Sequence, residues 1–142
     1  MYRKILVALD TTPADQELLP TIIRLAVLLK SELLLLHVAD GWAARNFEQL
    51  NLAESEEMKE DRRYLEETAA RLRAETGLAI SVRLALGSPP DQILKIVGDE
   101  KCDLIALASH GHRLVGDIIH GSTIDAVRHR AGVPIFVVPP KK

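Results

Sequence analysis

The chain has 142 residues, enough for one domain that buries about two-thirds of its unfolded surface without disulfides or a structural metal. The chain has 18 Lys and Arg and 20 Asp and Glu, a net charge of -2. This charge argues against a positive field over the whole protein that would bind nucleic acid or an anionic membrane. The single cysteine, Cys102, excludes an intramolecular disulfide and suits a reducing cytoplasm. Since no apolar run approaches the ~20 residues of a membrane span, we expect a soluble cytoplasmic protein with one domain over residues 1–142.

The first part of the chain alternates apolar runs of strand length with a segment of helical character. Residues 5–9 (ILVAL) form the first predicted strand. Thr12, followed by a proline and an acid, then predicts a helix over about residues 13–30, which Pro20 should kink or disturb in its first half. Residues 33–38 (LLLLHV) are the second predicted strand. Such continuous apolar runs are typical of strands covered by helices on both faces.

The middle of the chain predicts two helices around an edge strand. Residues 48–76 are charged, with apolar residues at three-, four- or seven-residue spacing, and Gly77 ends this predicted helix. Residues 80–84 alternate apolar and polar side chains, which indicates a strand at a sheet edge. Ser88, before two prolines and an acid, begins a short third helix.

The last part of the chain repeats the same alternation. Residues 104–108 (LIALA) predict another central strand. We expect the last helix to begin at Gly121 and Ser122 and to end near the basic residues 128–130. Residues 133–138 include a proline, which a strand tolerates mainly at an edge. The chain therefore predicts an α/β fold with a mainly parallel open sheet.

Ligands of open α/β sheets bind beyond the carboxyl ends of the strands, where the strand order reverses. Asp10 follows the first strand, and an acid there can bond ribose or adenine or help hold magnesium; the alternative is a turn or capping role. Gly121, Ser122 and Thr123 stand at the predicted start of the last helix, where free amide groups and the helix dipole favour a phosphate. The alternative is that glycine serves a turn and Ser122 only caps the helix.

Further candidate side chains precede that helix. Arg113 suits a phosphate because it stays charged, and His110 or His112 can donate to one. A zinc site is disfavoured, since Asp117 is the only nearby acid and no thiol is close in sequence. Residues 116–123 imitate a Walker A loop without its lysine, so we exclude a P-loop NTPase.

Three other residues each have a functional and a structural interpretation. Trp42 could stack on a base or pack under its loop, and the sequence leaves both roles open. His37 lies within a strand and is most simply a satisfied, partly buried histidine. Cys102 has no histidine that the sequence places beside it, which disfavours a nucleophile.

Together these segments resemble the universal stress protein (UspA) superfamily over essentially the whole chain. The matching pieces are ILVALD with Thr12, LLLLHV, GSP with Ile93, CDLIALASHG, GST and VPIFVV. The resemblance implies an open five-stranded parallel sheet in the order 3-2-1-4-5 with helices on both faces, like that of the adenine nucleotide alpha hydrolases. This order agrees with the two edge strands predicted above.

The ATP-binding branch of that family is marked by Gly-x2-Gly-x9-Gly-(Ser/Thr). Gly111, nine residues and Gly121-Ser122 reproduce its second part, while Ala108 replaces the first glycine. The resemblance places Asp10 and the backbone of Val38 by the adenosine. It implies that the remaining ligand contacts come from Ala8, where many members have proline, from Leu107 and Ala108 in the wall, and from Gly111, Gly121, Ser122 and Thr123 at the phosphates.

The leading hypothesis is a cytoplasmic universal stress protein that binds ATP with magnesium and acts as a nucleotide-responsive regulator. Two alternatives remain: a nucleotide-free interaction protein of the same fold, motivated by Ala108, and a slow ATPase or self-phosphorylating enzyme. No general base is convincingly paired with a nucleophile, which disfavours the enzyme. The resemblance and the apolar edge strand 133–138 also predict a homodimer through that strand.

Overall fold

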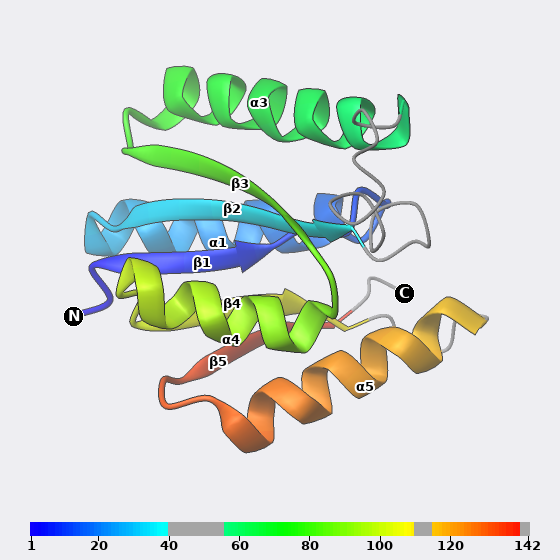
Figure 1. Cartoon of the computed structure of the whole chain (residues 1–142). Coiled ribbons are helices and arrows are strands. Elements are labelled where there is room, and N and C mark those ends of the chain that lie inside the picture. The colour runs from blue at the N-terminus through cyan, green and yellow to red at the C-terminus, as the bar shows by residue number, and fades with distance from the viewer. Residues whose placement is uncertain (40–55, 110–114, 140–142) are drawn as a thin grey trace.

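A computed structural model of the chain describes residues 1–39, 56–109 and 115–139, and describes residues 115–122 by their backbone alone. Its strands form one parallel sheet in the order β3-β2-β1-β4-β5 (Figure 1). The strands are β1 (Lys4–Ala8), β2 (Glu32–Ala39), β3 (Ile80–Leu86), β4 (Leu104–Ala108) and β5 (Ile135–Val138). The predicted fold class, strand order and edge strands are confirmed.

Two helices cover each face of the sheet. Helices α1 (Asp15–Leu29) and α3 (Glu56–Thr76) pack on one face, and α4 (Pro89–Glu100) and α5 (Val115–Arg130) pack on the other (Figure 1). Successive strand residues alternate between these faces, so Ile5 and Val7 join the core under α1 and α3, while Leu6 joins the core under α4 and α5. None of the helices in the described ranges is both long and apolar enough to cross a bilayer.

The first helix begins two residues later than predicted and runs without interruption through Pro20. Thr12 acts before the helix rather than at its cap: its hydroxyl accepts a hydrogen bond from the amide of Ala14 (3.3 Å). Pro20 is exposed and is the sixth residue of α1, so its ring lies at the surface and its missing N–H removes one intrahelical hydrogen bond.

Two αβ connections are built alike. Lys30 after α1 and Lys101 after α4 both adopt left-handed backbone, with φ of 57° and 56°. The next residue in each case, Ser31 or Cys102, donates its amide back to a carbonyl of the last helical turn (2.9 and 3.0 Å). Gly77, with φ +74°, ends α3 as predicted. These caps deliver the chain directly into the next strand.

The predicted start of the last helix is wrong. Helix α5 begins at Val115, so Gly121 and Ser122 are its seventh and eighth residues rather than its first turn. Residues 115–120 contain no proline to stop a helix, and glycine in a helix interior costs only about 1 kcal/mol relative to alanine. The buried residues Thr123 and Val127 lie after Gly121, and Val127 belongs to the core under α4 and α5.

Candidate functional site at the carboxyl edge of the sheet

The strand order reverses beside β1. From β1 the chain moves outward through β2 and β3, and β4 then returns to the other side of β1. After β1 the chain enters α1 on one face, and after β4 it reaches α5 on the other (Figure 1). Since ligands of open α/β sheets bind at such a reversal, the candidate site lies over the carboxyl ends of β1 and β4.

Three of the predicted ligand residues share one face at this edge. Ala8 ends β1, Val38 lies one residue before the end of β2, and Leu107 lies one residue before the end of β4. Ala8 and Val38 are partly buried against the core under α4 and α5, and Leu107 belongs to that core. The structure therefore brings Ala8, Val38 and Leu107 to one apolar face, a grouping that differs from the wall of Leu107 and Ala108 that the family resemblance implied.

Ala108 lies on the opposite face. Because strand side chains alternate, its methyl group packs against the core under α1 and α3, away from the face of Leu107. The residue that departs from the family's glycine pattern thus directs its side chain away from the apolar wall.

The loop after β1 is held by a side chain that the sequence analysis did not select. Asp15, the first residue of α1, is 1% exposed. Its two carboxylate oxygens accept the backbone N–H groups of Asp10 and Thr11, each at 2.9 Å. Thr11 adopts φ +63°, a left-handed conformation that costs about 1–2 kcal/mol for a residue with a Cβ. Asp15 thus stabilises a turn with an unfavourable backbone conformation at the candidate site.

Tyr64 of α3 completes the environment of that carboxylate. Its hydroxyl donates to Asp15 Oδ2 at 2.8 Å. Burial raises the pKa of Asp15, opposed by the hydrogen bonds from Asp10, Tyr64 and Thr11. Burial and the neighbouring carboxylate also raise the pKa of Tyr64 above its ordinary 10.0, so its hydroxyl stays protonated and keeps donating.

The sequence offered little signal for this cluster. Asp15 is an acid in the first turn of a helix, a position that the helix dipole favours, so its residue type alone indicates no further role. Its partner Tyr64 lies 49 positions further along the chain. Only the packing of α3 beside α1 on the same face of the sheet brings the two side chains together.

His37 makes a second connection between α3 and the same loop. Its Nδ1–H donates to the carbonyl of Leu9 (2.8 Å), and its Nε2 lies 3.4 Å from the carboxylate of Asp61 on α3. The expectation of a satisfied, partly buried histidine is confirmed. Burial raises the pKa of Asp61, and the nearby His37 opposes that shift.

The phosphate end of the predicted site is described only in part. His110, Gly111, His112, Arg113 and Trp42 lie outside the described residues. Gly121, Ser122 and Thr123 are residues of α5, and Thr123 is 7% exposed. The first four amide groups of a helix are its free donors; in α5 these belong to residues 115–118, so the anion-binding argument from free amides does not apply to Gly121 and Ser122.

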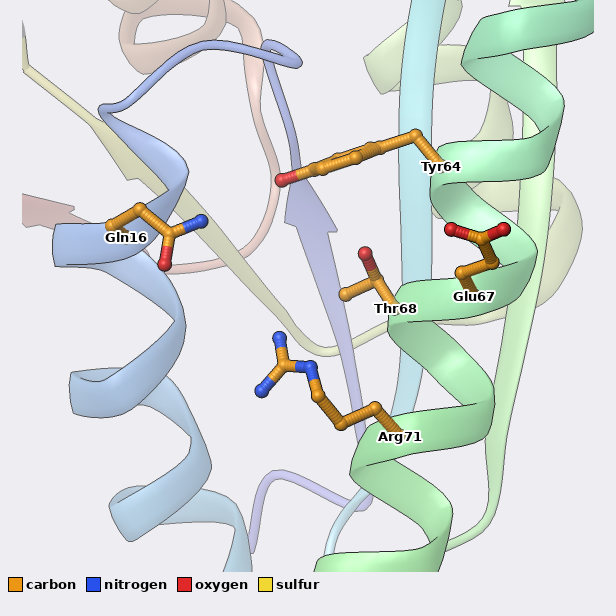
Figure 2. Close-up of a pocket in the computed structure, with 5 residues that line it drawn as sticks. All are labelled: Gln16, Tyr64, Glu67, Thr68 and Arg71. Carbon is orange, nitrogen blue, oxygen red and sulfur yellow. The ribbon is translucent and has the colours of Figure 1, made fainter.

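No group of three or more His, Cys, Asp or Glu in the described ranges could hold a metal ion. A pocket of about 310 Å³ lies between α1 and α3. Figure 2 shows its lining side chains, which are Gln16, Tyr64, Glu67, Thr68 and Arg71.

Comparison with known proteins defines the family. A model of the universal stress protein family matches residues 1–139. The chain belongs to the universal stress protein family. The universal stress protein MJ0577 of Methanocaldococcus jannaschii is 26% identical over 157 aligned residues, which cover 99% of this chain and 97% of that protein. The solved structure of MJ0577 matches with a TM-score of 0.75 at 27% identity, over 100% of this chain and 99% of that one.

Two more solved universal stress proteins share the fold and are described with a bound nucleotide. One, in complex with cAMP, has a TM-score of 0.70 at 17% identity and covers 97% of each chain. Another, from Archaeoglobus fulgidus and in complex with dAMP, has a TM-score of 0.70 at 18% identity over 96% of this chain and 98% of that one.

Proposed function

We propose that this universal stress protein binds an adenine nucleotide at the carboxyl ends of β1, β2 and β4, with ATP and magnesium as the leading ligand, and acts as a nucleotide-responsive regulator. The observation that carries the proposal is the meeting of Ala8, Val38 and Leu107 on one face, directly before the Asp10 turn at the strand reversal. The nucleotides named with two relatives of the same fold, cAMP and dAMP, share the adenine ring that such a wall would hold, and each carries a five-carbon sugar with phosphate.

Each part of the nucleotide has a proposed partner. The apolar wall would pack against the adenine, and Asp10, whose carboxylate can accept hydrogen bonds, would take the ribose or the base. Because Gly121 has no side chain, a phosphate can approach the surface of α5 there, even though its amide is inside the helix. Ser122, rather than the largely buried Thr123, would then add a hydroxyl donor.

The remaining phosphate contacts would come from residues that precede α5. Gly111, His110 and Arg113 would complete the phosphate side, and the last 33 residues, 110–142, hold five Lys or Arg against two Asp or Glu. Magnesium would be bound mainly through the phosphates, with Asp10 as the protein carboxylate nearest the strand reversal. It would neutralise phosphate charge.

Placement of Ala108 favours this proposal over a nucleotide-free interaction protein. That alternative rested on an added methyl group at Ala108 beside the ribose and phosphates; this methyl group packs against the core under α1 and α3, on the opposite face from the apolar wall. The methyl group therefore does not intrude on the proposed adenine position.

The test is a calorimetric titration of the purified protein with ATP, ATP plus magnesium, AMP and cAMP. Gly121→Asp should abolish binding, because a carboxylate would stand where a phosphate approaches, and Ser122→Ala should weaken it. Gly98→Asp is the matched control, since Gly98 is exposed on α4 and an added Cβ there meets no atom within 4 Å. Absence of heat at millimolar concentration of all four ligands would refute the proposal.

We also propose a cytoplasmic homodimer formed through β5. The strand lies at the sheet edge, and Phe136 and Val137 are 36% and 41% exposed. Two copies could pair these edges and cover both side chains. Light scattering at micromolar concentration measures the mass directly, and a monomeric value would contradict the dimer.

A further inference from the structure

Two side chains of α3 reach the loop after β1 by separate routes. Tyr64 donates to Asp15, which in turn accepts the amides of Asp10 and Thr11. One helical turn earlier, Asp61 lies 3.4 Å from His37, which donates to the carbonyl of Leu9. The backbone groups of three successive residues, 9–11, are therefore held by partners that themselves contact α3.

The contact from Tyr64 through Asp15 supports the residue of the loop with the unfavourable backbone conformation, Thr11. Thr11 is β-branched and left-handed, and its N–H together with that of Asp10 points to one buried carboxylate. Asp15 has three hydrogen-bond donors on its two oxygens, which is what a buried carboxylate requires. Removal of any one donor or of the carboxylate would loosen the turn that carries Asp10.

We propose that Asp15 and Tyr64 are positioning residues of the nucleotide site: Asp15 fixes the turn from which Asp10 meets the nucleotide, and Tyr64 links that turn to α3. This inference rests on the proposed function. Its consequence is that occupation of the site and the placement of α3 are coupled, since the nucleotide contacts the turn through Asp10 and α3 contacts the same turn through Asp15.

The surroundings of Tyr64 allow a clean test. Figure 2 shows the ring extending from α3 toward the start of α1, with the pocket beside it between the two helices. Tyr64→Phe removes the hydroxyl and keeps the ring in place, so packing is retained while the donor to Asp15 is lost. Asp15→Asn keeps the side-chain shape but replaces one acceptor oxygen by an NH₂ group, which cannot accept a loop amide.

The experiment compares Tyr64→Phe, Asp15→Asn and the double variant with the wild type. Tyr2→Phe is the matched control. Tyr2 packs against the same core, but it precedes β1 and so lies at the amino ends of the strands, away from the Asp10 turn. The first readout is amide hydrogen exchange of Asp10 and Thr11 by NMR in the ligand-free protein. The second is the dissociation constant for ATP, AMP and cAMP by calorimetry.

We expect Tyr64→Phe and Asp15→Asn to speed exchange at Asp10 and Thr11 selectively and to weaken nucleotide affinity by about tenfold, or about 1.4 kcal/mol. Because Tyr64 acts through Asp15, the double variant should lose little more than Asp15→Asn alone. A merely structural role would lower the melting temperature without this selective exchange or this non-additivity. Tyr2→Phe should leave both readouts unchanged.

Unchanged exchange and affinity in Tyr64→Phe overturn the inference, even if Asp15→Asn fails to fold. Additive losses in the double variant overturn the route through Asp15. A wild-type protein that binds none of the three nucleotides overturns the proposed function instead. In that case the exchange readout still decides the positioning of the loop: selective loss of protection supports it, and unchanged protection overturns it.

Discussion

Gly121 is expected to affect stability and ligand affinity in opposite directions when it is replaced by alanine. It is the seventh of the sixteen residues of α5, where alanine is favoured over glycine by about 1 kcal/mol. For a protein of this size, that difference raises the melting temperature by about 3–4 °C. A phosphate that approaches α5 at Gly121 would meet the new methyl group, so ATP affinity should fall at least about tenfold, which is about 1.4 kcal/mol.

Gly98→Ala is the matched control for this prediction. Gly98 lies near the end of α4, is exposed, and has no atom within 4 Å of an added Cβ. It should gain up to a similar stability and keep the wild-type affinity. Thermal unfolding followed by circular dichroism and calorimetric titration with magnesium and ATP measure the two quantities. A Gly121→Ala protein that is more stable and binds ATP as well as the wild type would refute the close approach at Gly121.

Three further predictions concern the rest of the molecule. Burial raises the pKa of Cys102 from 9.0 to about 11, so alkylation of the folded protein should be at least about 100-fold slower than alkylation of the urea-unfolded chain; similar rates would contradict this. Leu35→Ala, at a fully buried position in β2, should lower the free energy of unfolding by about 2–5 kcal/mol in urea titrations, and a loss below about 1 kcal/mol would be inconsistent with a close-packed core. Hydrogen bonding from Lys4 (3.0 Å), together with the charge of Arg83, holds the pKa of Glu100 below its ordinary 4.5. Because the folded pKa is the lower one, this stabilisation is present above pH 4.5 and is lost as the pH falls through the folded value, so Glu100→Gln should flatten the acid side of the stability curve; equal acid slopes would argue against it.

The strands could be predicted from the sequence because their signal is local. The four consecutive apolar residues of β1 and the five of β4 need cover on both faces, and the alternation of Ser81 and Arg83 with apolar neighbours needs one exposed face. The strand order, in contrast, came from the family resemblance, since a run of apolar residues does not specify its neighbours.

The start of α5 and the role of Asp15 could not be predicted from local patterns. Gly121 and Ser122 carry the ordinary signals of a helix start, but both residue types also occur inside helices at a cost of about 1 kcal/mol or less, and α5 runs from Val115 through both. Asp15 fits the helix dipole as a first-turn acid, and its actual partners lie in the preceding loop and on α3. The contacts of Asp15 join separate elements, and residue spacing within one element does not encode such contacts.

The short edge strand β5 has a consequence for aggregation. Pro134 and Pro139 stand directly outside its four residues, and neither proline has an N–H group to offer an added chain. A strand that pairs there can therefore extend a ladder over Ile135–Val138 but gains little beyond it, and fibril-forming segments are typically six or seven residues long without proline. The apolar side chains of this edge can thus serve self-association while the flanking prolines limit its propagation.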